Sequence, residues 1–295
     1  MIYLILIFQQ FIASTTHIFS KNLTFDLPPT LILLFRSLFA ASLFLCILLF
    51  RKQNPFLLER KELHKWLILG LLNVPLNQLL FYLSIKSTTA PNVALAYALS
   101  PIFILIISVV GLREKVNYLK VLGIVIGFLG ITIILVEKGV SLKSEYFLGN
   151  LLALLASISW AFYSTYGKPM INKYGSTYST AIAMIMGFLM YLPISLAIGD
   201  LNNVQMIKPI HWLQILYLSV MTSGVAYLLW YYALKRLPAS SVGVFNNLQP
   251  VFTTILSIIF FEQTLTELYV IGGVFVLVGV TLAQTNSFGG ESRTK

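Results

Sequence analysis

Two apolar stretches of equal length decide the fold: NVALAYALSPIFILIISVV at residues 92–110 and SVGVFNNLQPVFTTILSII at residues 241–259. Each has a proline at its centre, Pro101 and Pro250, and the two prolines are 149 residues apart. A proline removes one helical hydrogen bond, and in lipid the freed carbonyl needs another partner. The pair therefore predicts a duplicated membrane segment with a helix break at mid-membrane, and Pro101 and Pro250 are the expected hinges. A fixed kink that serves packing is the alternative.

The whole chain has the composition of a membrane protein. Of its 295 residues, 58% are hydrophobic and 10% are charged, whereas soluble domains carry about 25% charged residues. The sequence predicts an all-α integral membrane protein of ten transmembrane helices, because continuous apolar runs disfavour the alternating strands of a barrel. The ten runs are Ile2–Phe19, Thr30–Phe50, Trp66–Ile85, Asn92–Gly111, Leu119–Val136, Phe147–Tyr166, Thr177–Ile198, Trp212–Leu234, Ser240–Phe261 and Leu268–Gln284.

Basic residues gather on one side of the predicted topology. With the N-terminus inside, the inner segments hold fourteen Lys and Arg residues and the outer loops hold five. The positive-inside rule then predicts that both termini lie in the cytoplasm, and we expect a multi-pass protein of the plasma membrane. This asymmetry also explains the net charge of +10, so nucleic acid is not expected as a partner.

The second half of the chain repeats the first. Residues 78–135 align with residues 227–284 without a gap, and seventeen positions are identical, among them Lys86/Lys235 and Gly123/Gly272. Each half has five spans, an odd number, so the second half enters the bilayer from the opposite side. We therefore predict two inverted five-helix repeats, 1–140 and 141–295, the second with a short cytoplasmic C-terminal tail. Inverted repeats are typical of many secondary transporters.

Polar and aromatic residues inside the spans predict an internal cavity, since such residues are costly in lipid and usually face the interior of a bundle. Interhelical hydrogen bonds and the interfacial aromatic belt are the alternatives for any single one. Spacing of four residues places Asn73 with Asn77, and Ser223 with Tyr227, on one face of a helix. The candidate substrate-binding residues are Gln10, Thr16, His17, Asn73, Asn77, Tyr82, Tyr97, Trp160, Tyr163, Tyr227, Tyr231 and Asn246.

Charged residues are nearly absent from the predicted membrane interior. All ten acidic residues lie in loops, tails or at span ends, which disfavours a proton relay or a sodium site built on a buried carboxylate. Arg36 is the one cation well inside a span. It either faces the cavity and attracts an anionic group or satisfies freed carbonyls, and the second interpretation is slightly favoured.

Patterns of catalysis and metal binding are missing from the sequence. There is no HExxH or GxSxG motif, and the single cysteine, Cys46, lies within a span and excludes disulfides and cysteine-based metal sites. We expect no enzymatic activity, no cofactor and no metal. Glycines 123, 127 and 130, echoed by 272 and 279, predict close helix contacts within the bundle or across a dimer, so a monomer and a homodimer both stay open.

These features resemble the EamA type of the drug/metabolite transporter superfamily. The resemblance rests on Leu99-Ser100-Pro101 and Leu248-Gln249-Pro250, on Glu114 and Glu262 after those spans, and on the glycines that follow. Trp160-Ala161-Phe162 through Lys168 matches the aromatic-to-lysine pattern of the family, whereas the first copy, 13–21, lacks the tryptophan. The resemblance implies ten helices in two inverted five-helix repeats.

The expected function is secondary transport of a small organic metabolite, an amino acid or a similar amphipathic solute. We expect an exporter that works by alternating access of the two halves, with the small-molecule substrate and the lipid bilayer as its partners. Two alternatives remain at this point. One is a non-transporting membrane scaffold or receptor, and the other is an integral-membrane enzyme that acts on lipid.

Overall fold

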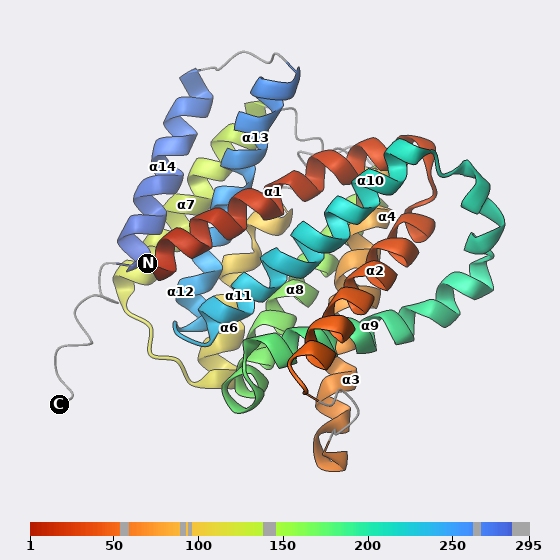
Figure 1. Cartoon of the computed structure of the whole chain (residues 1–295). Coiled ribbons are helices and arrows are strands. Elements are labelled where there is room, and N and C mark those ends of the chain that lie inside the picture. The colour runs from red at the N-terminus through yellow and green to blue at the C-terminus, as the bar shows by residue number, and fades with distance from the viewer. Residues whose placement is uncertain (54–58, 89–92, 94–95, 138–145, 262–266, 285–295) are drawn as a thin grey trace.

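The computed structural model describes residues 1–53, 59–88, 93, 96–137, 146–261 and 267–284 (Figure 1). Within these ranges the regular elements are all helices. The first half contributes α1 (Ile2–Asp26), α2 (Pro29–Phe50), η1 (Arg60–Glu62), α3 (Leu63–Leu71), η2 (Leu72–Gln78), α4 (Leu79–Ser87), α6 (Ser100–Leu112) and α7 (Tyr118–Glu137). The second half contributes α8 (Phe147–Tyr174), α9 (Ser176–Ile198), η4 (Asp200–Met206), α10 (Pro209–Tyr217), η5 (Leu218–Ala226), α11 (Tyr227–Leu234), α12 (Ala239–Gly243), η6 (Val244–Asn247), α13 (Leu248–Phe261) and α14 (Glu267–Gln284).

The helices confirm the predicted membrane class. In the described residues, six helical segments are long and apolar enough to cross a membrane: Ile2–Asp26, Pro29–Phe50, Arg60–Ser87, Phe147–Tyr174, Ser176–Ile198 and Pro209–Leu234. Shorter apolar helices at Ala96–Leu112, Tyr118–Gly130 and Val270–Ala283 fall on three further predicted spans. The remaining predicted span, Ser240–Phe261, is divided among α12, η6 and α13. The boundary of the repeats at residue 140 and the C-terminal tail, 285–295, lie outside the described residues.

Two long helices each contain a π-helical segment, and the two segments occupy corresponding places. In the first half η2 joins α3 to α4, and in the second half η5 joins α10 to α11. A π-helix bonds residue i to i+5 and is frequent at functional sites. Pro75 lies inside η2 and cannot donate a helical hydrogen bond, which accounts for one of the two distortions. No proline lies in η5.

The two central prolines lie where helices begin. Pro101 is in the first turn of α6, and Pro250 is in the first turn of α13, directly after the 3₁₀ segment η6. The first turn of a helix has no intrahelical partner for its N–H groups, so a proline costs little there. At the helix break predicted in each span, a new helix therefore begins. The role of these prolines as hinges stays a prediction.

The packing of the helices follows the inverted repeat. Helix α1 contacts α13, and its counterpart α8 contacts α6, the counterpart of α13. Helix α2 contacts its own counterpart α9 in the same way. Equivalent helices therefore meet equivalent partners across the boundary between the halves, as a two-fold relation requires.

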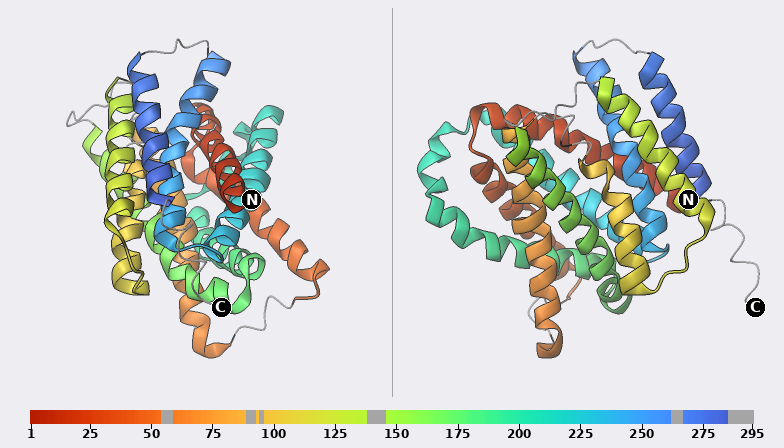
Figure 2. Two further views of the ribbon diagram at one scale, coloured as in Figure 1. Left: turned by 90° about the vertical axis from the view of Figure 1, so that its left-hand side faces the viewer. Right: turned by 180° about the vertical axis from the view of Figure 1, so that it is seen from behind.

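Helices α7 and α14 give the clearest sign that the halves are inverted (Figure 2). A Cβ atom on Gly123 would lie 2.5 Å from the carbonyl oxygen of Gly279, and one on Gly130 would lie 2.5 Å from that of Gly272. The early part of α7 thus meets the late part of α14, and the reverse, so the equivalent helices run antiparallel. Because Gly123 and Gly130 align with Gly272 and Gly279, the two contacts are copies of each other.

Candidate functional site

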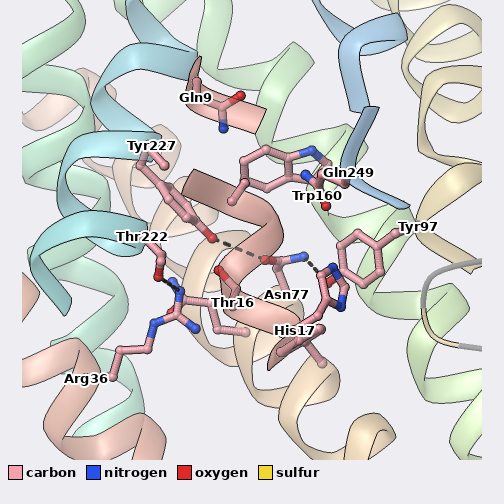
Figure 3. Close-up of a pocket in the computed structure, with 14 residues that line it drawn as sticks. Gln9, Thr16, His17, Arg36, Asn77, Tyr97, Trp160, Thr222, Tyr227 and Gln249 are labelled. Carbon is pink, nitrogen blue, oxygen red and sulfur yellow. Dashed lines mark hydrogen bonds between the residues drawn. The ribbon is translucent and has the colours of Figure 1, made fainter. Parts of the chain in front are cut away.

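A cavity lies between the two halves (Figure 3). Its volume, measured as the space open to the centres of water molecules, is about 70 Å³, which is below the usual range of small-molecule sites, about 300–1,000 Å³. Elements of both halves supply its walls, namely α1, α2, η2, α4, α8, η5, α11, α13 and the segment before α6. The lining residues are Gln9, Ala13, Thr16, His17, Arg36, Asn77, Gln78, Phe81, Tyr97, Trp160, Thr222, Ala226, Tyr227 and Gln249.

Asn77 in η2 connects the walls of this cavity. Its amide nitrogen donates to the Tyr97 hydroxyl and to the Ala156 carbonyl oxygen, each at 2.9 Å. Its amide oxygen accepts from the Tyr227 hydroxyl at 3.3 Å. One buried amide therefore binds Tyr97 of its own half and two groups of the other half, as Figure 3 shows for the two tyrosines.

Arg36 is the only Asp, Glu, Lys or Arg among the fourteen lining residues. Its side chain is on α2 and is 3% exposed. The guanidinium donates to the hydroxyls of Ser223 at 2.8 Å, Thr222 at 3.0 Å and Tyr82 at 3.2 Å. Its described partners are hydroxyls rather than the freed carbonyls that the sequence slightly favoured, so the cavity-facing interpretation is the one that the geometry supports.

Aromatic rings form one side of the cavity. The Trp160 ring packs edge-on against Tyr227, with centroids 5.2 Å apart, and tilts against Trp230 at the same centroid distance. Behind Trp160, Tyr163 stacks on Tyr231 with centroids 4.9 Å apart. Aromatic pairs of this geometry add stability beyond their buried area. The cavity is therefore polar at Asn77 and Arg36 and apolar along Trp160.

A smaller pocket adjoins the cavity on the side of α13. It shares His17, Tyr97 and Gln249 with the cavity and adds Asn246 and Pro250. Asn246 accepts a hydrogen bond from the Gln10 amide at 3.0 Å and donates one to the Ser100 hydroxyl at 2.9 Å. Asn246 thus joins α1, the start of α6 and η6 at one point.

Comparison with known proteins agrees with this architecture. The model of the EamA-like transporter family matches the chain twice, over residues 1–136 and 147–285. The chain belongs to the EamA-like transporter family. It is therefore a membrane transporter and not an enzyme, and the predicted resemblance to EamA proteins is confirmed.

Relatives of this EamA-family transporter share most of its length. Two proteins of Archaeoglobus fulgidus are each named an uncharacterized transporter. The first is 29% identical over 95% of the chain and 96% of its own length. The second is 31% identical over 86% of the chain and 88% of its own length. The transporter YyaM of Bacillus subtilis, also named uncharacterized, is 27% identical over 83% of the chain and 80% of its own length. A crystal structure that covers 99% of both chains matches with a TM-score of 0.81 at 19% identity, which supports the fold alone.

The structure brings six of the twelve candidate residues of this EamA-family transporter to the cavity. They are Thr16, His17, Asn77, Tyr97, Trp160 and Tyr227. Asn246 lines the smaller pocket, and Gln10 is its partner. The other four stand behind the wall, where Tyr82 supports Arg36, Asn73 accepts from Gln78, and Tyr163 stacks on Tyr231. Whether any of the twelve binds substrate stays a prediction.

Sequence reasoning left several lining residues out of the candidate set. Gln9, Arg36, Gln78 and Gln249 are all polar and inside predicted spans, so the signal that selected their neighbours could have found them. Thr222 and Phe81 gave weaker signals, because hydroxyls and apolar rings are common on any membrane helix. In the described residues, no group of three His, Cys, Asp or Glu side chains is placed to hold a metal ion.

Proposed function

We propose that this EamA-family transporter carries a small organic metabolite, an amino acid or a similar amphipathic solute, by alternating access. The observation that carries the proposal is the cavity between the halves, with the buried amide of Asn77 bonded to Tyr97 and Tyr227. Groups from both inverted halves line this one cavity. Movement of one half against the other would therefore open that space to either side in turn.

The lining supports a solute with polar and apolar parts. Amides, hydroxyls and one guanidinium stand beside the rings of Trp160, Tyr97 and Phe81. A solute of amino-acid size can place its polar end on the first group and its side chain on the second. The described acidic side chains do not line the cavity, which favours facilitated transport or exchange over coupling through a buried carboxylate.

Exchange in proteoliposomes tests this function. Vesicles that hold the purified transporter are loaded with labelled amino acids and placed in an unlabelled mixture, and the efflux of label is followed. Asn77→Leu is expected to reduce the initial rate at least tenfold, since it removes all three bonds of the amide. Asn172→Leu, at an exposed position of α8, is the matched control and should exchange at the normal rate. Equal rates in vesicles with and without protein would contradict the proposal.

We further propose that the transporter works outward in the plasma membrane, with both termini in the cytoplasm. The excess of basic residues in the predicted inner segments supports this orientation. The outward direction is tested by comparing the metabolite contents of cells that express the transporter with those of cells that express Asn77→Leu. An exporter lowers the internal concentration of its substrate and raises the external one, whereas an importer does the reverse.

A further inference from the structure

Arg36 carries a charge that no acidic residue of the cavity neutralises. Its three described hydrogen-bond partners, Ser223, Thr222 and Tyr82, are neutral hydroxyls. None of the fourteen lining residues is Asp or Glu. A buried charge is expensive unless an opposite charge or several hydrogen bonds compensate it, and buried charged side chains are rarely left unpaired. The cavity is where an anion can reach this guanidinium, because Arg36 lines it.

The guanidinium keeps donors for such an anion. It has five N–H groups, of which one on Nε, one on Nη1 and one on Nη2 are used by the three hydroxyls. One N–H remains on each terminal nitrogen. A carboxylate is the preferred partner of such free guanidinium N–H groups. The hydroxyls hold the guanidinium in place, and Ser20 in turn donates to the Tyr82 hydroxyl at 3.2 Å.

A second, independent feature of the lining points to a ligand with a donor group. The side-chain oxygens of Gln9 and Gln78 are buried and have no hydrogen-bond partner within the described part of the chain. Each residue is 2% exposed, and both line the cavity. Unpaired buried acceptors are costly and rare in native structures. They are suited to accept hydrogen bonds from an ammonium group.

The Arg36 guanidinium and the Gln9 amide lie apart in the cavity. Figure 3 places Arg36 and Gln9 at opposite ends of the labelled side chains, with Tyr227 and Asn77 between them. Trp160 lies beside this line and offers an apolar face. A solute that spans the cavity thus meets a cation at one end and the neutral amide oxygen of Gln9 at the other.

We propose that Arg36 binds the carboxylate of a zwitterionic substrate, whose ammonium group donates to the amide oxygen of Gln9. The side chain of the solute then packs against Trp160 and Tyr227. This inference rests on the proposed transport function and narrows its substrate to a class. It also assigns specificity to Arg36, because an uncharged analogue would leave the guanidinium without its anion.

An efflux experiment with a mixture of solutes tests the proposed substrate class. Proteoliposomes are loaded with the twenty protein amino acids, the matching 2-oxo acids and the matching primary amines, and released solutes are identified by mass spectrometry. We expect amino acids to be released from the vesicles. The amide of the amino acid that is released fastest should compete with that amino acid at least about tenfold less well. Efflux of amines alone, or equal competition by the amide, would overturn the inference and leave the transport function intact. No protein-dependent efflux of any solute would instead count against the transport function.

Variants of Arg36 test whether this side chain causes the preference for the amino acid over its amide. Arg36→Gln should lose the acid-over-amide preference, while Arg51→Gln, the same change on an exposed arginine outside the cavity, should keep it. If Arg36→Gln does not fold, Arg36→Lys decides the matter: it keeps the charge but loses the guanidinium N–H groups, and the preference should fall about tenfold. A folded variant of either kind with the full preference of the original chain would refute the role of Arg36.

Discussion

The carboxylate of Glu114 accepts a hydrogen bond from the Ser240 hydroxyl at 2.7 Å, although the two residues are 126 positions apart and belong to different halves. The same carboxylate accepts from the backbone N–H groups of Ala239 at 2.6 Å and Ser240 at 3.2 Å, at the start of α12. Lys168 lies 3.4 Å from it. One acidic side chain after α6 thus caps a helix of the other half and joins α6, α8 and α12.

Removal of this carboxylate should destabilise the fold. Glu114→Ala abolishes the hydrogen bonds from Ala239, Ser240 and Lys168 to a side chain that is 11% exposed, and we expect a loss of about 2 kcal/mol in the free energy of unfolding. The melting temperature in detergent, followed by tryptophan fluorescence, should fall by several degrees. Glu59→Ala, at a side chain that is 56% exposed, is the control and should leave the melting temperature unchanged. Equal melting temperatures for both variants would contradict this assignment.

The same contact predicts a dependence of stability on pH. Burial raises the pKa of Glu114, but the hydrogen bonds of Ser240 and Ala239 and the charge of Lys168 outweigh it and hold the pKa below its ordinary value of 4.5. The unfolded chain therefore takes up this proton first as the pH falls. The stabilisation is complete above the ordinary pKa and is lost progressively below it.

This dependence is measured as the difference in melting temperature between the original chain and Glu114→Gln. The difference should be constant between about pH 6 and pH 7 and should narrow below about pH 4.5, as protonation removes the charge in the unfolded and then in the folded protein. Taking the difference cancels the titration of acids that both proteins share. A difference that stays constant down to about pH 3 would show that the charge of Glu114 does not contribute.

The glycine contacts between α7 and α14 predict an intolerance to even one methyl group. Gly279→Ala would place a Cβ atom 2.5 Å from the Gly123 carbonyl oxygen and from the Gly127 nitrogen. Overpacking of this kind costs about 1–3 kcal/mol, and backbone atoms cannot turn aside as a side chain does. Gly273→Ala is on the same helix, where a Cβ atom would meet nothing within 4 Å. Gly279→Ala should lower the melting temperature and Gly273→Ala should not, and the reverse order would disprove the contact.

Asn246 should matter less to stability than its buried position suggests. Asn246→Leu removes the bonds to Gln10 and Ser100, and interhelical hydrogen bonds in membrane proteins contribute about 0.6 kcal/mol each. We expect a loss of about 1 kcal/mol, measured by thermal unfolding as above. A loss of several kcal/mol would show that Asn246 determines where helix α13 begins, and that its role is not only to join helices.

The orientation in the membrane can be tested with single cysteines. The chain has one cysteine, Cys46, so a Cys46→Ser background accepts one new cysteine at a time. We expect a cysteine at Lys52 to be protected from a membrane-impermeant maleimide in intact cells, and one at Lys208 to react. Labelling of Lys52→Cys before lysis would reverse the proposed topology.

The fold was largely predictable from sequence because its signals are redundant. Long apolar runs, a gapless internal repeat and matching prolines and glycines all indicate the same architecture. The glycines show this best: their alignment in sequence predicted close helix contact, and the structure places Gly123 against Gly279. The sequence left open whether that contact lay within one chain or between two, because either would use the same small residues.

The site was less predictable because the π segments break the usual spacing. On an α-helix, Asn73 and Asn77 would share a face, and both were expected at the cavity. In the π-helical segment η2, Asn77 lines the cavity while Asn73 does not, and the side chain of Asn73 instead accepts a hydrogen bond from the side-chain amide of Gln78. In the second half Thr222 and Tyr227, five residues apart, both line the cavity. A spacing rule of four residues cannot anticipate this.

The crossing of α7 and α14 has a consequence for how such a chain can be assembled. The two helices contribute aligned glycines to the contact. The interface is therefore isologous within a single polypeptide, as in a symmetric homodimer. A surface of that kind is complementary to its own copy. Two half-length chains inserted in opposite directions would therefore meet at Gly123 and Gly130 of each, as α7 and α14 meet here, with no covalent connection between them.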